Sequence, residues 1–333
     1  MSAGTPSAGL AADAPAAAWA RRSALPRWLE PDEVHRRLLA LFALAVFTVA
    51  ALIAWESARG ALPSIRAYGW RFLLSTDWDP VAEKFGALPY LYGTLVSSAL
   101  ALLLALPLGI GAAVYLAELA PRAVGEVVSF VVELLASIPS IVYGIWGVFV
   151  LAPVLRAAVE PWLIARLGFL PLFRGYPFGI GMLNAGIVLA IMIVPTIVSI
   201  SREVLLAMPR SLREAALALG ATRAEAIGVT LDAARPGILG AVILALGRAL
   251  GETMAVTMVI GNSNHISASL LAPGATMASV IANEFTEATS PLHLSALFEV
   301  ALVLFALTVA VNGCARLLVI WATGGRRDVA GAA

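Results

Sequence analysis

Six runs of apolar residues, each about long enough to cross a membrane as a helix, organise most of this chain. Polar stretches separate the runs, and the third run is interrupted at Ile138-Pro139-Ser140. The pattern predicts an all-α integral membrane protein with six transmembrane helices. The runs lie at about residues 38–55, 92–116, 127–155, 178–200, 238–260 and 296–321.

The stretches outside these runs set the predicted domain boundaries. Residues 1–30 are rich in Ala, Pro and Ser without periodicity, which predicts a disordered cytoplasmic tail. Residues 31–325 form the predicted transmembrane domain, which includes a polar segment at 201–236. Residues 326–333 form a second, short tail.

The composition agrees with a membrane protein and narrows its chemistry. Hydrophobic residues make up 60% and charged residues 13% of the chain, whereas soluble domains have about a quarter charged residues. A net charge of +1 gives no reason to expect nucleic acid as a partner. One cysteine excludes an internal disulfide, and three scattered histidines show no metal-ligand spacing. No nucleophile–base pair supports a membrane enzyme.

The lysine content bears on ATP. A P-loop needs a lysine directly after glycine to reach the nucleotide phosphates. The sole lysine, Lys84, follows Glu83. We therefore expect no catalytic site and no cofactor in this chain, and if ATP drives it, a separate subunit hydrolyses the ATP.

The distribution of basic residues predicts the orientation. With both ends inside, fourteen Arg and Lys residues fall on the inner side and seven on the outer side. This predicts cytoplasmic termini and a cytoplasmic 201–236 segment. The first outer loop holds Trp70, Trp78 and Tyr90, which either anchor the chain at the membrane interface or form a docking surface; anchoring is the favoured interpretation.

The polar 201–236 segment predicts two short helices. Leu212, Ala215, Ala216 and Leu219 recur at helical spacing and form one apolar stripe. Gly220 would end the first helix, and Thr222 with Glu225 three residues later forms a capping-box pattern for the second. An ordinary loop helix lying on the membrane surface is the alternative.

The run Glu214-Ala215-Ala216-x-x-x-Gly220 resembles the EAA loop of permease subunits of bacterial ABC importers. In that family the loop forms a coupling helix that seats in a groove on the ATPase subunit. The resemblance therefore implies that these four residues couple the chain to an ATPase. The sequence departs from the family pattern further on, where Asp232 stands in the place of a proline.

A closer resemblance, to phosphate importer permeases of the PstC type, covers about residues 38–321. It is carried by Phe85-Gly86-Ala87-Leu88-Pro89, by residues 133–144, by Gly247-Arg248-Ala249-Leu250-Gly251-Glu252-Thr253-Met254-Ala255 and by Ala282-Asn283-Glu284-Phe285. It implies a type I importer (MetI-like) fold in the bacterial inner membrane, forming half of a translocation path for phosphate.

The same resemblance implies the partners. These are a second permease of the PstA type, a dimer of ATPase subunits of the PstB type and a periplasmic phosphate-binding protein of the PstS type. The lipid bilayer is a further partner, since the chain would be embedded in it. An importer of another oxyanion such as phosphonate is an alternative. An ion-coupled carrier without an ATPase is a further one.

Arg248 and Glu252 are the candidate substrate-path residues. Four positions apart on one predicted helix, they would share a face, and charges in a membrane must face protein or water. One interpretation is a structural ion pair. The other is an anion path in which Arg248 binds phosphate oxygens, Glu252 accepts the proton that hydrogen phosphate carries and sulfate lacks, and Thr253 and Thr257 add hydroxyl donors. Glu133 and Glu299, also in apolar runs, are expected to face inward in structural roles.

Overall fold

The computed structural model describes residues 31–322, so the two predicted tails at 1–30 and 326–333 lie outside the described part. The described chain is helical, without a named strand, and it separates into two units that meet between Glu56 and Ser57. The α-helices are α2 Pro31–Tyr68, α3 Leu88–Val114, α4 Arg122–Ser137, α5 Ser140–Trp146, α6 Ala152–Val154, α7 Glu160–Leu167, α8 Met182–Leu206, α9 Arg210–Ala218, α10 Arg223–Leu250, α11 Met254–Val259, α12 Met277–Glu284 and α13 Pro291–Ala322.

Six helical stretches within residues 31–322 are long and apolar enough to cross a membrane, which confirms the predicted fold class. They are Val34–Leu73, Leu88–Leu119, Ser140–Leu167, Met182–Leu206, Arg223–Leu250 and Pro291–Trp321. The third and fifth differ from the predicted runs. The 127–155 run is divided at Ile138-Pro139 between α4 and the next span, and the fifth span begins fifteen residues early, at Arg223.

The first of the two units contains the beginning of α2. No other part of the described chain covers its apolar side chains, and none of the most apolar stretch of this span is buried. Phe42, Val46 and Phe47, for example, are 64%, 72% and 73% exposed. Such a surface is stable only against lipid or another chain.

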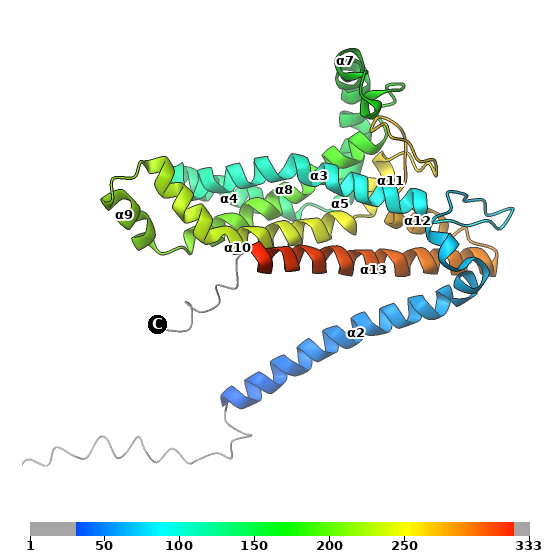
Figure 1. Cartoon of the computed structure of the whole chain (residues 1–333), viewed down its shortest axis with the longest axis horizontal. Helices are drawn as coiled ribbons and strands as arrows, with labels where there is room; N and C mark the ends of the chain where they lie inside the picture. Colours follow the sequence, from blue (N-terminus) through cyan, green and yellow to red (C-terminus); the bar gives the residue numbers. More distant parts are fainter. Residues whose placement is uncertain (1–30, 323–333) are drawn as a thin grey trace, which may run out of the picture. The chain divides into compact units, whose positions relative to one another are not determined.

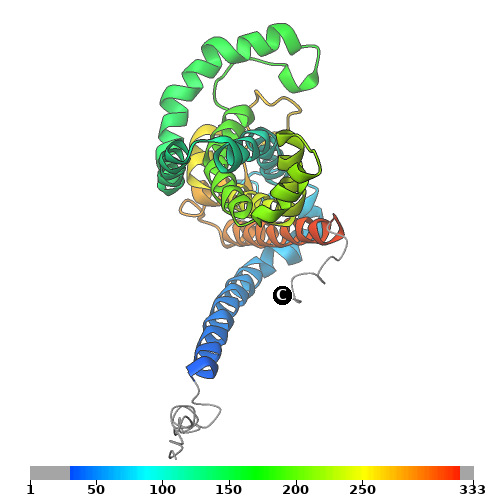
Figure 2. The same ribbon diagram turned by 90° about the vertical axis from the view of Figure 1, so that its left-hand side faces the viewer.

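In the second unit, α8 is the central helix. Two-thirds of its apolar window (67%) is buried, and it packs along both α3 and α10 (Figure 1). Small residues allow the close approach to α3. A Cβ on Gly109 would lie 2.8 Å from Ile197 Cγ2, and one on Gly186 would lie 2.4 Å from Leu100 Cδ2. Seen from the end of the bundle that carries α9, helices α3, α4 and α10 lie around α8 (Figure 2).

The final helix, α13, is attached to the second half of α2 by polar contacts. Ser295 donates its hydroxyl to the Gly60 carbonyl at 2.8 Å and accepts the Ser64 N–H at 2.9 Å. Glu299, one turn further along α13, is 6% exposed, as expected for an acid that faces inward. Glu133, in contrast, is exposed on α4 in this chain.

The segment between α2 and α3, together with the start of α3, builds a second core. Trp78 and Tyr90 are 7% and 2% exposed and pack edge-to-face, with ring centroids 4.9 Å apart. The favoured prediction that they are interfacial anchors is therefore wrong for both, because each fills the space between the loop and the ends of α12 and α13. Trp70 does stand out, at 72% exposed.

Candidate functional site

The helix that carries Arg248 ends two residues later, so Arg248 and Glu252 do not lie on one continuous helix. α10 ends at Leu250, Gly251 caps it, and α11 begins at Met254. The prediction of a single helix through both residues is wrong. Two glycines in five residues weaken the helix, and the carboxylate of Glu252 accepts the Ala255 N–H at 3.2 Å, at the start of the next helix.

The structural ion pair, one of the two interpretations for these residues, is absent. Within residues 31–322, no carboxylate lies within 4.0 Å of the Arg248 guanidinium, and Arg248 is exposed in this chain. Glu252 is partly buried and uses one oxygen for the cap of α11. The charges of both residues are therefore available to a third group at the break.

The two predicted hydroxyl donors are already engaged with the backbone. Thr253 donates to the Gly251 carbonyl at 3.2 Å, and Thr257 donates to the Thr253 carbonyl at 2.7 Å. The first bond lies in the turn between α10 and α11, and the second lies in the first turn of α11. Each hydroxyl oxygen keeps its capacity to accept a hydrogen bond, but neither proton is free in this arrangement.

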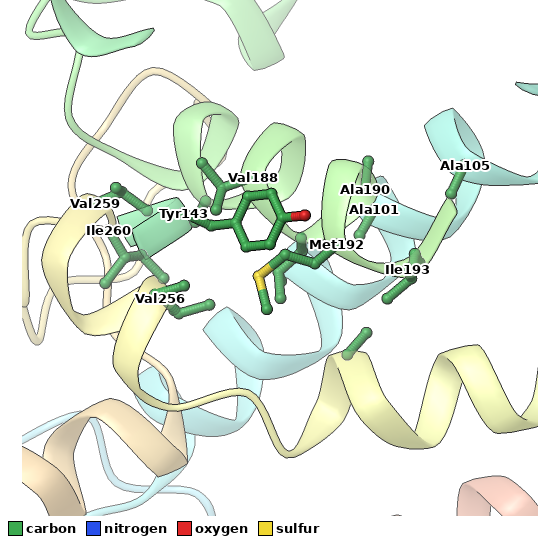
Figure 3. Close-up of a cluster of buried hydrophobic side chains, with 14 of the residues drawn as sticks. Ala101, Ala105, Tyr143, Val188, Ala190, Met192, Ile193, Val256, Val259 and Ile260 are labelled. Carbon is green, nitrogen blue, oxygen red and sulfur yellow. The ribbon is translucent and has the colours of Figure 1, made fainter. Parts of the chain in front are cut away.

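A second break lies between α4 and α5, at Ile138-Pro139. Helix breaks within a membrane require that the freed carbonyls find partners inside the protein. The Ser137 hydroxyl donates to the Leu134 carbonyl at 2.8 Å, and the Tyr143 hydroxyl donates across the break to the Leu135 carbonyl at 2.8 Å. Tyr143, whose ring lies among Val188, Met192 and Val256 (Figure 3), thus joins the two segments.

The two breaks are neighbours because α5 packs against α11. The contact has no spare room. A Cβ on Gly144 would lie 2.8 Å from Met258 Sδ and 3.0 Å from Ala255 Cα. Sequence reasoning found Arg248 and Glu252 but missed Tyr143 and Gly144. The available signal was a tyrosine and a glycine four and five residues after a proline in an apolar run.

The 201–236 segment forms a projecting helix and a helix that returns into the bundle. α9 buries none of its residues: Leu212 and Leu217 are 37% and 45% exposed, and Leu219, which caps the helix, is 90% exposed. Glu214 and Ala215 are exposed, and Ala216 is partly buried. Most of the predicted apolar stripe is therefore uncovered within the described chain. Figure 1 shows α9 at one end of the bundle.

The turn between α9 and α10 follows its prediction closely. Gly220 has φ +89°, a left-handed conformation that ends α9, and the Ala221 N–H bonds to the Ala216 carbonyl at 3.1 Å. Thr222 and Glu225 form the predicted capping box. The second helix is not short, however, because α10 runs for 28 residues through Pro236 without a break.

α9 is tied to the end of the second span by an ion pair. Arg213 Nη1 lies 2.6 Å from Glu118 Oε2, and the Glu118 side chain is only 7% exposed. Arg223 adds a bond to the Glu118 carbonyl at 3.3 Å. Sequence reasoning missed Glu118, which lies two residues past the end of the predicted 92–116 run and gives no local sign of its partner.

At the other end of the bundle, Glu284 gathers the outer loops. Trp78 donates its indole N–H to Glu284 Oε2 at 2.8 Å, and His293 Nε2 lies 2.9 Å from the same oxygen. Asn264 donates to the Trp78 carbonyl at 3.1 Å. These bonds fix the loop after α2 against the last outer loop.

Comparisons with known proteins relate the chain to membrane transport components. Residues 105–320 match the family model described as "Binding-protein-dependent transport system inner membrane component". The chain is 44% identical to the phosphate transport system permease protein PstC of Mesorhizobium japonicum, over 92% of this chain and 95% of that protein. It is 46% identical to PstC of Haemophilus influenzae, over 88% and 93%. A structure of the inward-facing MetNI methionine ABC transporter aligns with 70% of this chain and 94% of its own, at 20% identity and a TM-score of 0.47.

Proposed function

Since the chain belongs to the family of binding-protein-dependent transport system inner membrane components, we propose that it is the permease subunit of an ATP-driven importer of inorganic phosphate. The observation that carries the proposal is the 44% identity, over nearly all of both chains, to a protein named as a phosphate transport permease. As a transport subunit of this kind, the chain is not an enzyme by itself. It is a multi-pass protein of the inner membrane.

In this proposal α9 is the coupling helix and an ATPase subunit covers it. The support is the exposed apolar surface at Leu217 and Leu219 beside the charged Glu214, on a helix that buries nothing within this chain. The small side chains of Ala215 and Ala216 would let an ATPase subunit approach α9 closely. Gly220 ends the helix in a tight turn. In this proposal the end of the bundle that carries α9 lies on the cytoplasmic side, in agreement with the distribution of arginine.

The break between α10 and α11 is the proposed substrate gate. A guanidinium presents a planar fork of N–H donors that matches two oxygens of a phosphate. Arg248 has no carboxylate partner in the described chain, so an anion would not have to displace one. The broken helix also supports the proposal, because transporters place substrate at interrupted helices whose backbone groups face a cavity.

Glu252 is the proposed filter. At neutral pH hydrogen phosphate carries a proton that it can donate to a carboxylate, whereas sulfate carries none and meets only repulsion. Glu252 has one oxygen free of the α11 cap, and that oxygen can accept this proton in a hydrogen bond. Thr253 and Thr257 hold the turn and the start of α11 through their backbone bonds and so set the position of the carboxylate.

The proposed complex contains a second permease similar to this one, two ATPase subunits on the cytoplasmic side and a periplasmic phosphate-binding protein outside. ATP binding would draw the two coupling helices together and turn the permease pair from an inward-open to an outward-open state. A permease for phosphonate is the alternative substrate assignment, because a phosphonate keeps three of the four oxygens of phosphate and also carries a proton that it can donate.

The test is uptake in membrane vesicles that contain the assembled complex and its binding protein. We expect phosphate uptake that requires ATP, resists excess sulfate and responds to phosphonate only weakly. Stronger inhibition by phosphonate than by phosphate itself would reassign the substrate. Uptake by this chain in the absence of any ATPase subunit would overturn the proposal in favour of an ion-coupled carrier.

A further inference from the structure

A cavity of about 410 Å³ lies at the end of the bundle that carries α9, away from the break at Arg248. It is enclosed by the last turn of the second span, the start of α4, the end of α8 and the start of α9. Four arginines line it, and two glutamates accompany them. These residues are Arg122, Arg202, Arg210, Arg213, Glu118 and Glu126.

The acids do not neutralise the arginines. Glu118 is committed to Arg213 at 2.6 Å. Glu126 makes no ion pair of 4.0 Å or less within residues 31–322, and the same is true of the three remaining arginines. The lining therefore carries net positive charge in a partly enclosed space, where like charges are costly unless an anion joins them.

Arg202 shows the missing partner most directly. Its Nε atom is enclosed, without contact to solvent, and has no hydrogen-bond acceptor in the described chain. An enclosed N–H donor without an acceptor is rare in native proteins and is unfavourable. Arg202 lines the cavity, and a rotation of its side chain would bring the enclosed N–H to an acceptor bound there.

Two helix starts add to the positive potential. α4 and α9 each follow a proline, Pro121 and Pro209, and each has arginine as its first residue. Neither has a side-chain cap, so their first backbone N–H groups remain without a side-chain acceptor. The partial positive charge of a helix start favours an anion, and here it supplements the arginine cluster.

We propose that this cavity binds a phosphate group, separate from the anion in transit. Phosphate oxygens suit this lining because several guanidinium groups and backbone N–H groups can each take one oxygen. Such a group would brace α9 against α4 and α8, the elements that carry motion between the coupling helix and the bundle. The group belongs either to the headgroup of an anionic lipid, which basic pockets at the cytoplasmic ends of spans bind, or to inorganic phosphate from the cytoplasm.

The experiment compares the assembled complex with a variant in which Arg122→Gln and Arg202→Gln are combined, both outside α9. Arg235→Gln is the matched control, because Arg235 is an arginine of the same segment, 71% exposed and paired only with Asp232 at 3.8 Å. One arm measures retention of phosphatidylglycerol against phosphatidylcholine by native mass spectrometry. The other measures binding of radiolabelled inorganic phosphate by equilibrium dialysis, without the binding protein.

We expect the double variant to lose at least ten-fold in one arm, and the arm that changes identifies the source of the phosphate group. The control should match wild type in both arms. No difference between the double variant and wild type in either arm would overturn the proposal, and so would an equal loss in the control. Loss of ATPase subunits with unchanged binding in both arms would instead mark the cavity as a protein contact and also overturn it.

A variant with Arg122→Lys and Arg202→Lys guards against a simple folding defect. It keeps the charge and should recover part of the binding. Binding to the cavity is measured without transport, so a failed uptake assay would contradict the proposed function and leave this result standing.

Discussion

Arg213 on α9 and Glu118 at the end of the second span form an ion pair of 2.6 Å, with the glutamate nearly buried and the arginine one-third exposed. This pair is the one ion pair of two oppositely charged side chains that joins α9 to another segment within residues 31–322. Besides its two turns and its packing on α10, this contact is a route by which a displacement of the projecting helix can reach the bundle.

The first prediction concerns this pair. Arg213→Ala leaves the Glu118 carboxylate enclosed without its partner, which should destabilise the complex by about 1–2 kcal/mol. We expect a lower thermal midpoint in detergent. Phosphate uptake should fall more strongly than ATP hydrolysis, because hydrolysis takes place in the ATPase subunits, whereas uptake also needs the link between α9 and the bundle. A double-mutant cycle with Glu118→Gln measures the pair itself. Additive effects of the two changes would show that the residues do not interact.

The second prediction tests the filter. Glu252→Gln keeps an oxygen that can accept the Ala255 N–H, so the start of α11 should persist, but it removes the negative charge. We expect excess sulfate to inhibit phosphate uptake at least several-fold more in the variant than in wild type, with unchanged assembly. Glu284→Gln, an equal change at the outer end of the bundle, serves as the control. Sulfate resistance identical to wild type would remove Glu252 from the filter.

Some of this arrangement could be read from the sequence because it depends on local chemistry. The six spans follow from apolar length, and the turn at Gly220 with the capping box at Thr222 and Glu225 follows from residues adjacent in the chain. The one-faced stripe of α9 likewise needs only helical periodicity.

The remaining features depend on contacts between distant segments or on competition between nearly equal local states. Whether a helix continues through Gly251 is decided by the Glu252 cap and by packing of α11 on α5, which no periodicity shows. Trp78 was misassigned to the interface because its acceptor, Glu284, lies 206 residues away. The partner of Arg213 is 95 residues away, so Glu118 gave no recognisable signal.

The third prediction concerns the contact between the two broken helices. Gly144→Ala places a methyl group 2.8 Å from Met258 Sδ and 3.0 Å from Ala255 Cα. Backbone movement is needed to relieve the second contact, so we expect a loss of about 1–3 kcal/mol and reduced uptake. Gly111→Ala in α3 is the control, since its Cβ meets nothing within 4 Å. Equal thermal midpoints for the two variants would contradict the tight packing of α5 on α11.

The fourth prediction concerns the outer loops. Glu284→Leu removes the acceptor of the Trp78 indole N–H and the partner of His293, at 2.8 and 2.9 Å. Leaving a buried donor without an acceptor costs about 1–3 kcal/mol. In intact right-side-out vesicles we expect faster proteolysis of the loop at 69–87 in the leucine variant. Glu284→Gln, which keeps an acceptor, should resist proteolysis nearly as well as wild type. Equal proteolysis of all three proteins would show that Glu284 does not hold the loop.

The fifth prediction separates conformation from contact at Gly220. Its φ of +89° is strained for any residue with a Cβ, yet a Cβ there would meet nothing within 4 Å. Gly220→Val therefore acts only through the backbone, at about 1–2 kcal/mol, and should change the angle between α9 and α10 rather than the bundle. We expect loss of ATP-driven uptake with normal membrane insertion, and a milder loss in Gly220→Asn, since asparagine tolerates this region better.

Gly69→Val is the matched control, because Gly69 also has a positive φ, +56°, and open space around its Cβ, but lies at the outer end. Uptake lost to the same degree in both valine variants would mean that general strain, not the α9–α10 turn, is responsible.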